Sequence, residues 1–326
     1  MSFRAGTPRY TDRVMKRVLI AACLLVSACF AARPVIFDTD MGNDIDDALA
    51  LAMLHSLTSR GECQLIGVTL TNAAPSAVPY IRMINRFYGR GDLPVGAAIK
   101  TLKDGAQDGY MSAALRTMKA ETSGTAEPAP TVLRRLLTAA REKVIIVQTG
   151  FSTNLAALLE TRDGAALAKE KVALLVVMAG NFADGAPEYN VKIDVSAAKS
   201  VFERWPTPIV FSGFEIGRDL LYPAISIEHD FTYASPHPIA ESYRAYQKMP
   251  YNRPTWDLTA ALQAVRPEHG YFTLSDPGTV QVESNGVTHF SAGNGDRRYL
   301  RLDPAQRKEI LEVLALLSSE PPVQRN

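Results

Sequence analysis

Residues 38–47 (DTDMGNDIDD) hold five aspartates and no positively charged residue. They follow the apolar run 34–37 (PVIF) and precede the apolar run 48–54 (ALALAML). This pattern predicts a buried strand that ends in a carboxylate cluster, and a helix that begins from it. Carboxylates held close together repel one another, so they must take up protons or bind a cation. Because the candidate ligands are all oxygens, Ca²⁺ or Mg²⁺ is the expected occupant.

The elements that would position this cluster alternate along most of the chain. The expected strands are 35–38, 64–71, 144–149, 173–178 and 208–212, and the expected helices are 48–57, 77–88, 131–140, 155–159 and 196–204. Alternating strands and helices with continuously apolar strands predict an α/β fold, with an open, mostly parallel, Rossmann-like sheet covered by helices on both faces. Ligands bind such sheets beyond the carboxyl ends of the strands. The polar residues after each strand should therefore meet at one edge.

The remaining segments are less regular. Residues 103–130 are rich in Gly, Ala, Thr and Ser, which predicts a long surface insertion or flexible loop. Residues 227–254 carry Tyr, His and Pro and could fold over the edge of the sheet as a lid. The pair Asn285-Gly286 lies between strand-like pieces and predicts a hairpin. A helix over 304–317 should close the chain.

The N-terminus predicts export. The basic start at 15–17 (MKR) precedes the apolar stretch 18–29, which ends in small residues and is too short to span a bilayer permanently. Residues 26–29 (VSAC) resemble a bacterial lipobox, so a lipid anchor at Cys29 and simple cleavage after Ala31 or Ala32 both stay open. We therefore expect residues 1–32 to be an extension with an export signal and residues 33–326 to form one domain. The mature chain would be periplasmic or secreted.

The composition limits which binding partners and metal sites are expected. The formal net charge is +1, which favours neither a nucleic acid nor an acidic surface as a partner. Two of the three cysteines lie in the expected signal, leaving Cys63 alone. The mature chain can therefore form neither an intrachain disulfide nor a thiolate metal site.

Several motifs in order resemble the inosine–uridine-preferring nucleoside hydrolase family. The hallmark of that family, Asp-x-Asp-x-Gly…Asp-Asp-Ala after the first strand, is present over 38–48 with two extra residues before the aspartate pair, as in a branch of exported relatives. The other similar stretches are 68–72 (VTLTN), 93–97 (LPVGA), 148–150 (QTG) with Asn154, 177–180 (VMAG), 188–190 (EYN) with Asp194, and 256–257 (WD). The resemblance extends from Arg33 to about Leu317.

The resemblance implies hydrolysis of the N-glycosidic bond of a ribonucleoside with a bound Ca²⁺. It implies that calcium is held by the side chains of Asp40, Asp47 and Asp257 and the main-chain carbonyl of Thr149. Asp40 would also take the proton of the attacking water as general base. By the same resemblance, the ribose would be bound by Asp46, Asn72, Glu188 and Asn190, with Met178 packed beside it. Asp38 and Asp44 would be supporting residues.

One position departs from the family pattern. Many relatives have a histidine that protonates the leaving base where this chain has Trp256, and tryptophan cannot donate a proton in this way. Trp256 could instead stack on a planar base. His229, His237 and Tyr251 are candidate proton donors from the expected lid. The segment 181–187 is also shorter than in many relatives, so one asparagine contact to the ribose would be missing, and Asn181 or Asp184 could substitute for it.

Three other functions share features with this sequence. An EF-hand loop fails because its twelfth position, counted from Asp38 or Asp40, is Leu49 or Leu51 where a bidentate glutamate is needed. A Mg²⁺-dependent phosphatase of the haloacid-dehalogenase type also begins with Asp-x-Asp, but it expects Thr or Ser where Gly42 stands. An exported calcium- and ribose-binding protein with little turnover stays open. The base preference and the formation of a homo-oligomer also stay open.

Overall fold

The computed structural model describes residues 1, 32–102 and 108–323. The strands are β1 (Arg33–Thr39), β2 (Cys63–Leu70), β3 (Val95–Ala97), β4 (Glu127–Pro128), β5 (Val144–Gln148), β6 (Val172–Met178), β7 (Ile209–Ser212), β8 (Leu221–Tyr222), β9 (Arg253–Pro254), β10 (Thr273–Leu274), β11 (Gly278–Val282), β12 (Thr288–Ala292) and β13 (Arg297–Arg301). The α-helices are α2 (Asp46–Ser59), α3 (Ala77–Phe87), α4 (Gly109–Thr117), α5 (Ala129–Ala139), α6 (Thr153–Leu159), α7 (Gly164–Lys171), α8 (Tyr189–Ile193), α9 (Val195–Arg204), α10 (Phe214–Arg218), α11 (Ala224–His229), α12 (Pro238–Tyr246), α13 (Trp256–Val265) and α14 (Arg307–Ser319).

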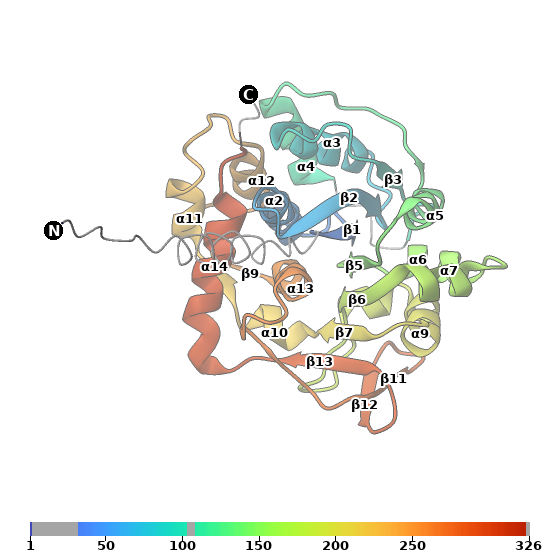
Figure 1. Cartoon of the computed structure of the whole chain (residues 1–326). Coiled ribbons are helices and arrows are strands. Elements are labelled where there is room, and N and C mark those ends of the chain that lie inside the picture. The colour runs from blue at the N-terminus through green and yellow to red at the C-terminus, as the bar shows by residue number, and fades with distance from the viewer. Residues whose placement is uncertain (2–31, 103–107, 324–326) are drawn as a thin grey trace. The chain divides into compact units, whose positions relative to one another are not determined.

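The central sheet runs in the order β12-β11-β13-β7-β6-β5-β1-β2-β3-β4, with β10 paired to β13 (Figure 1). Along this order every pairing from β13 to β4 is parallel, and the antiparallel pairs of this sheet involve only β10, β11, β12 and β13. In the middle of the sheet Asp38 pairs with Thr69 on one side and Gln148 on the other. The carboxyl ends of β1, β2 and β5 therefore lie at one edge. The predicted fold class, a mostly parallel α/β sheet, is confirmed.

Both faces of the sheet are covered, as the continuously apolar strands predicted. On β1, Val35 and Phe37 pack into the core beneath α2, α3, α13 and α14, whereas Ile36 packs into the core beneath α5, α6, α7 and α9. In Figure 1 the helices α2, α13 and α14 lie on the left of the sheet, and α5, α6, α7 and α9 lie on the right. Alternate residues of one strand thus fill opposite cores, which fixes how β1 delivers the residues that follow it.

Both segments that were expected to be irregular contain regular elements. The stretch 103–130 is not simply a loop, because it contains α4, and Tyr110, Met111, Ala114 and Leu115 of that helix are buried. Periodicity over so short a helix was too weak to reveal it. The stretch 227–254 likewise contains α12 and β9. The hairpin at Asn285-Gly286 is confirmed by the antiparallel pair β11–β12.

The predicted export signal and lipid-anchor residue Cys29 lie outside the described residues. Among the described helices, none is both long and apolar enough to cross a membrane. From Arg33 onward the described chain forms one compact unit.

Candidate metal centre and substrate cavity

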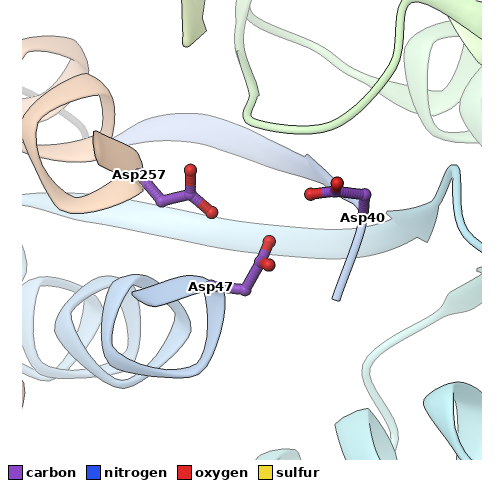
Figure 2. A group of neighbouring side chains, drawn as sticks. All are labelled: Asp40, Asp47 and Asp257. Atoms are coloured by element: carbon purple, nitrogen blue, oxygen red, sulfur yellow. The ribbon is translucent and has the colours of Figure 1, made fainter. Parts of the chain in front are cut away.

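Three aspartates from distant parts of the sequence meet at the edge of the sheet. Asp40 directly follows β1, Asp47 is the second residue of α2, and Asp257 is the second residue of α13. Each contributes one carboxylate oxygen to a group in which all three atoms lie within 4.8 Å of one another. Figure 2 shows the three side chains pointing toward a common space. Both helices begin at this space, so their N-terminal N–H groups add positive potential there.

The donor set fits a hard cation. All three aspartates are buried, and the Oδ2 atoms of Asp40 and Asp257 have no hydrogen-bond partner. Burial raises the pKa of Asp47 to about 7. Burial and the neighbouring carboxylates raise the pKa of Asp40 and of Asp257 well above the usual range. Buried, unpartnered, mutually repelling carboxylate oxygens are costly unless protons or a cation neutralise them. A cation with a preference for oxygen satisfies all three.

The loop between β1 and α2 has a fixed shape. The hydroxyl of Thr39 donates to the Asp47 carboxylate and accepts the N–H of Met41 at 3.1 Å. Gly42 has a φ of +116°, a backbone conformation that L side chains rarely adopt. The Tyr110 hydroxyl on α4 accepts the N–H of Gly42 at 3.0 Å and donates to the Asp44 carbonyl at 2.7 Å. Helix α4, which sequence analysis did not predict, therefore supports this loop of residues 40–45, called the aspartate loop below.

The chain after β5 closes the floor of the site. A Cβ at Gly150 would lie 2.2 Å from the Thr71 hydroxyl and 2.5 Å from the main-chain nitrogen of Asp40, so only glycine allows this approach. The approach places Thr149 at the metal site, where its hydroxyl lies 3.5 Å from the Asp47 carboxylate. The main-chain carbonyl of Thr149, the predicted calcium ligand, accepts a hydrogen bond of 2.7 Å from the Asn190 amide. A carbonyl oxygen has a second lone pair, which leaves it able to bind a cation as well.

A cavity of about 220 Å³ opens above the three aspartates. It is lined by Asp40, Asn43, Asp44, Asp46, Asp47, Thr149, Met178, Glu188, Tyr189, Asn190, Phe214, Arg253, Trp256 and Asp257. The metal centre therefore forms the polar end of a cavity that has room for a small molecule. Aromatic side chains line another part of it.

Four of the predicted substrate-binding residues line the cavity at its polar end, namely Asp46, Met178, Glu188 and Asn190. Asp46 accepts the N–H of Asp257 at 3.1 Å. Glu188 accepts main-chain N–H groups at the start of α8, which holds its carboxylate in place, and burial raises its pKa to about 7. The Asn190 amide donates to the carbonyls of Thr149 and Met178. These side chains are fixed before any ligand binds.

Asn72, predicted to bind ribose, is placed elsewhere by the structure. It is not among the residues that line the cavity. Its amide nitrogen donates to the carbonyls of Asp40 and Met41 at 3.2 and 3.3 Å, and its amide oxygen accepts the N–H of Ala74 at 3.1 Å. Asn72 therefore stabilises the aspartate loop, because both the nitrogen and the oxygen of its side-chain amide are hydrogen-bonded to main-chain groups.

Asn154 and Asp194 of the matching motifs, and Asn181, the suggested replacement for a ribose contact, also make contacts within the fold. Asn154 donates to the Asp38 carboxylate at 2.8 Å, beneath the site. Asp194 caps α9 and pairs with Lys100 at 2.7 Å. Asn181 donates to Asp184 at 2.6 Å within a closed turn. None of these residues lines the cavity.

Trp256, the residue that departs from the family pattern, forms an aromatic wall of the cavity. Its ring stacks on Phe214 with a centroid distance of 5.4 Å and an interplanar angle of 23°. Its indole N–H donates to the Phe214 carbonyl at 2.9 Å. A Cβ at Gly217 would lie 2.4 Å from Trp256, so the glycine allows α10 and α13 to pack this closely. The ring is thus held rigidly at the cavity wall.

The three proposed proton donors do not line the cavity. His237 accepts N–H groups at the start of α12 through Nδ1 and contacts the Tyr233 hydroxyl through Nε2 at 2.8 Å. Burial lowers its pKa to about 3, so this histidine is a neutral helix cap. The Tyr251 hydroxyl donates to the Tyr243 carbonyl at 2.6 Å. His229 ends α11, away from the lining residues.

Sequence analysis missed four residues of the cavity: Asn43, Tyr189, Phe214 and Arg253. Asn43 is next to Asp44, and Tyr189 lies between Glu188 and Asn190, so their positions in the sequence were a signal that could have identified them. Arg253 and Phe214 carried no such signal, because they reach the cavity only through the tertiary packing of β9 and α10.

Comparisons with known proteins agree with the motifs. Residues 35–309 match the family described as inosine-uridine preferring nucleoside hydrolase. The pyrimidine-specific ribonucleoside hydrolase RihA of Citrobacter koseri is 31% identical over 206 residues, which are 57% of this chain and 61% of that protein. RihA of Salmonella typhimurium is 31% identical over 217 residues, which are 60% of this chain and 65% of that protein. The matches therefore span less than two thirds of these curated relatives.

Solved structures share the fold. A nucleoside hydrolase from Bacillus anthracis has a TM-score of 0.65 at 18% identity, covering 87% of this chain and 99% of that chain. The type III effector protein XopQ, complexed with adenosine diphosphate ribose, has a TM-score of 0.70 at 15% identity, covering 98% of this chain and 100% of that chain. At such identities the likeness establishes the architecture alone.

Proposed function

Because this chain belongs to the inosine-uridine preferring nucleoside hydrolase family, we propose that it hydrolyses the N-glycosidic bond of ribonucleosides, releasing free base and ribose. The observation that carries the proposal is the buried group of Asp40, Asp47 and Asp257 at the polar end of a small-molecule cavity. Acidic side chains in this arrangement suit a reaction in which water attacks a carbon that develops positive charge.

We propose Ca²⁺ as the cation. The side chains of Asp40, Asp47 and Asp257 and the main-chain carbonyl of Thr149 would hold it, and Ca²⁺ accepts carboxylates and carbonyls together. When bound, the cation supplies the positive charge that holds a water molecule and lowers its affinity for protons. The unpartnered carboxylate oxygens of Asp40 and Asp257 support this assignment.

The proposed steps at the chain's own residues follow from their positions. Asp40 takes the proton of the attacking water, because only one of its two carboxylate oxygens is needed for the cation and the other can accept the proton. Asp46, Glu188 and Asn190 would hold the ribose hydroxyls, and hydrogen bonds from hydroxyls to charged acceptors contribute about 1.5–3 kcal/mol each. Negative charge around the sugar also stabilises an anomeric carbon with positive character. These residues thus orient the sugar and stabilise its charged transition state.

The proposal is tested by a reducing-sugar assay across purine and pyrimidine ribosides, with the wild type and Asp40→Ala in the presence of calcium. We expect ribose release by the wild type and a loss of at least about 100-fold in the variant, as for removal of other central acid–base groups. If no riboside is cleaved at any pH while ribose analogues still bind, the chain is a binding protein instead. Release of phosphate from phosphomonoesters would instead favour the alternative function, a Mg²⁺-dependent phosphatase.

We also propose that residues 1–32 direct export, on the basis of their sequence pattern alone. Expression of the full chain in a Gram-negative host, followed by fractionation and mass spectrometry of the mature N-terminus, tests this proposal. A periplasmic product that starts at or after Cys29 is expected, with a lipid on Cys29 if the lipobox is used. A product that keeps residues 15–28 in the cytoplasm would refute it.

A further inference from the structure

The cavity holds a charge that the mechanism above does not use. Among the described residues that line it, Arg253 is the only lysine, arginine or histidine. The other charged lining residues are the aspartates 40, 44, 46, 47 and 257 and Glu188. A single guanidinium among these carboxylates needs an explanation, because the ribose hydroxyls and the cation site already have acidic partners.

Arg253 is fixed in place by its backbone. Strand β9 pairs with β8, with Arg253 opposite Tyr222 and Pro254 opposite Leu221. The side chain of the preceding residue, Asn252, accepts the N–H of Ala224 at 2.8 Å. The segment that carries the guanidinium is therefore tied to the fold and does not belong to a free loop.

The guanidinium itself is held against the aromatic wall. Its Nε donates to the two oxygens of Asp44 at 2.9 and 3.1 Å, and its Nη2 donates to the same carboxylate. Its Cζ lies 5.5 Å from the ring centroid of Trp256 and 5.2 Å from that of Tyr246. The hydrogen bonds of this guanidinium to described residues use Nε and Nη2, which leaves Nη1 for a ligand. The Arg253 side chain is only 26% exposed, so both N–H groups of Nη1 belong to a largely buried cation that lines the cavity.

The leaving base needs such a group. None of the histidines lines the cavity, and the indole N–H of Trp256 is bound to the Phe214 carbonyl. The hydroxyl of Tyr189, which does line the cavity, donates to the Asn43 side chain at 3.3 Å. When the C–N bond breaks, its electron pair passes to the ring nitrogen of the base, while the C–O bond forms from water and Asp40 takes the water's proton. The departing base is then an anion until it takes a proton from solvent. A guanidinium stays protonated at all relevant pH values, so it can stabilise this anion by hydrogen bonds without acting as an acid.

We infer that Arg253 is the leaving-group residue of this site: it hydrogen-bonds the base through Nη1 and stabilises the negative charge on it, with Asp44 holding the guanidinium in place. This inference rests on the proposed function. Arg253 would take the place of the missing histidine, not as an acid but as a hydrogen-bond donor that stabilises negative charge. This role is like that of an oxyanion hole. It also sets the substrate class, because such a donor favours bases that leave readily as anions and that present a carbonyl oxygen next to the glycosidic nitrogen.

The test compares substrates whose leaving groups need different amounts of help. Uridine and p-nitrophenyl β-D-ribofuranoside are assayed with the wild type, Arg253→Met, Arg253→Lys and the double variant Asp44→Asn/Arg253→Met. Nitrophenolate is already a stable anion. We expect Arg253→Met to lower kcat/KM for uridine by about 100-fold or more, as for loss of one oxyanion donor, and for the nitrophenyl riboside by less than about 10-fold. Arg253→Lys should retain part of the uridine activity because it keeps the charge.

The double variant shows whether an unpaired Asp44 causes the loss, since the Asp44→Asn substitution removes the charge that would be left unpaired. We expect it to show the same substrate dependence as Arg253→Met. Arg218→Met is the matched control: Arg218 lies 5.8 Å from the Phe214 ring but does not line the cavity. The activity of Arg218→Met on both substrates should stay within about twofold of the wild type, because an exposed side chain away from the reacting bond has little effect when replaced. Calcium binding, measured by calorimetry, reports whether each variant is folded.

The inference is wrong if Arg253→Met lowers activity on both substrates equally, or leaves uridine cleavage intact. It is also wrong if Tyr189→Phe, rather than Arg253→Met, shows the loss confined to uridine, because the phenol would then be the proton donor. If the wild type cleaves purine ribosides but neither of these two substrates, the inference fails and the proposed function stands. If it cleaves no riboside at all, the proposed function itself fails.

Discussion

The main-chain N–H of Asp257 donates a hydrogen bond of 3.1 Å to the carboxylate of Asp46. This bond joins the first turns of α13 and α2, which carry two of the three metal-site aspartates. Asp46 therefore has a structural function in addition to the ribose contact proposed for it.

The two functions of Asp46 can be separated. Asp46→Asn keeps an oxygen for the Asp257 N–H but removes the charge, so we expect a higher KM for ribosides and calcium affinity within about 10-fold of the wild type. Asp46→Ala leaves a buried N–H without a partner, which costs about 1–3 kcal/mol. It should weaken calcium binding clearly more than Asp46→Asn does. Isothermal titration with CaCl₂ measures the difference, and equal calcium affinities in the two variants would contradict the structural function.

The buried carboxylates predict a dependence of stability on pH. Burial raises the pKa of Asp38, Asp47 and Glu188 to about 7, above the ordinary carboxyl value. The folded, metal-free protein thus holds protons more tightly than the unfolded chain, so its stability falls as pH rises from about 4 to about 7.

Calcium should reverse this trend, because it binds the ionised carboxylates. We expect the calcium-induced rise in Tm to be larger at pH 8 than at pH 5. At 100 times the Kd, calcium should stabilise the fold by about 2.7 kcal/mol. Thermal unfolding in EDTA and in excess CaCl₂ at both pH values checks this. A calcium effect that is greater at pH 5 would show that the carboxylates are not the ligands.

Gly150 should be intolerant of any side chain. In Gly150→Ala the added Cβ would meet the Thr71 hydroxyl and the main-chain nitrogen of Asp40, with backbone on one side and no room to move. We expect a loss of about 1–3 kcal/mol in the free energy of unfolding, together with lower activity because Asp40 shifts. Gly109→Ala is the control, since a Cβ there meets nothing within 4 Å. Urea denaturation measures both; similar behaviour of the two variants would refute the steric argument.

Tyr110 should stabilise the aspartate loop from α4. Tyr110→Phe removes the hydroxyl that bonds both the Gly42 N–H and the Asp44 carbonyl, and it should destabilise the fold by about 1–3 kcal/mol. Tyr299→Phe is a control whose hydroxyl accepts only a long bond of 3.4 Å from Arg301. If Tyr110→Phe unfolds at the same denaturant concentration as the wild type, α4 does not support the loop.

The part of the site that is local in sequence could be predicted. The apolar run before residue 38 and after residue 47 indicated a strand and a helix, and that alone placed Asp40 and Asp47 at a strand end and a helix start. The continuously apolar strands likewise predicted a parallel sheet with two covered faces. These features depend on neighbours in the chain, and the structure agrees with them.

The part that depends on distant contacts could not be predicted. The Asp44–Arg253 pair joins residues 209 positions apart, and no local pattern marks Arg253. Tyr110 lies in a stretch whose composition indicated a loop. Asn72 follows its strand as the family pattern requires, but its amide turns to the backbone of Asp40 and Met41. Which way a side chain turns at the end of a strand is decided by the packing around it.

The central claim is that Asp40, Asp47 and Asp257 hold a divalent cation on which riboside hydrolysis depends. The most direct test is a calcium titration of enzyme stripped with chelator, with ribose release from a cleaved riboside as the readout, for the wild type, Asp257→Asn and the surface control Asp230→Asn. We expect no release without calcium, full recovery in the wild type and Asp230→Asn near one equivalent, and no recovery in Asp257→Asn. Undiminished hydrolysis by the stripped wild type, or normal recovery in Asp257→Asn, would contradict the claim.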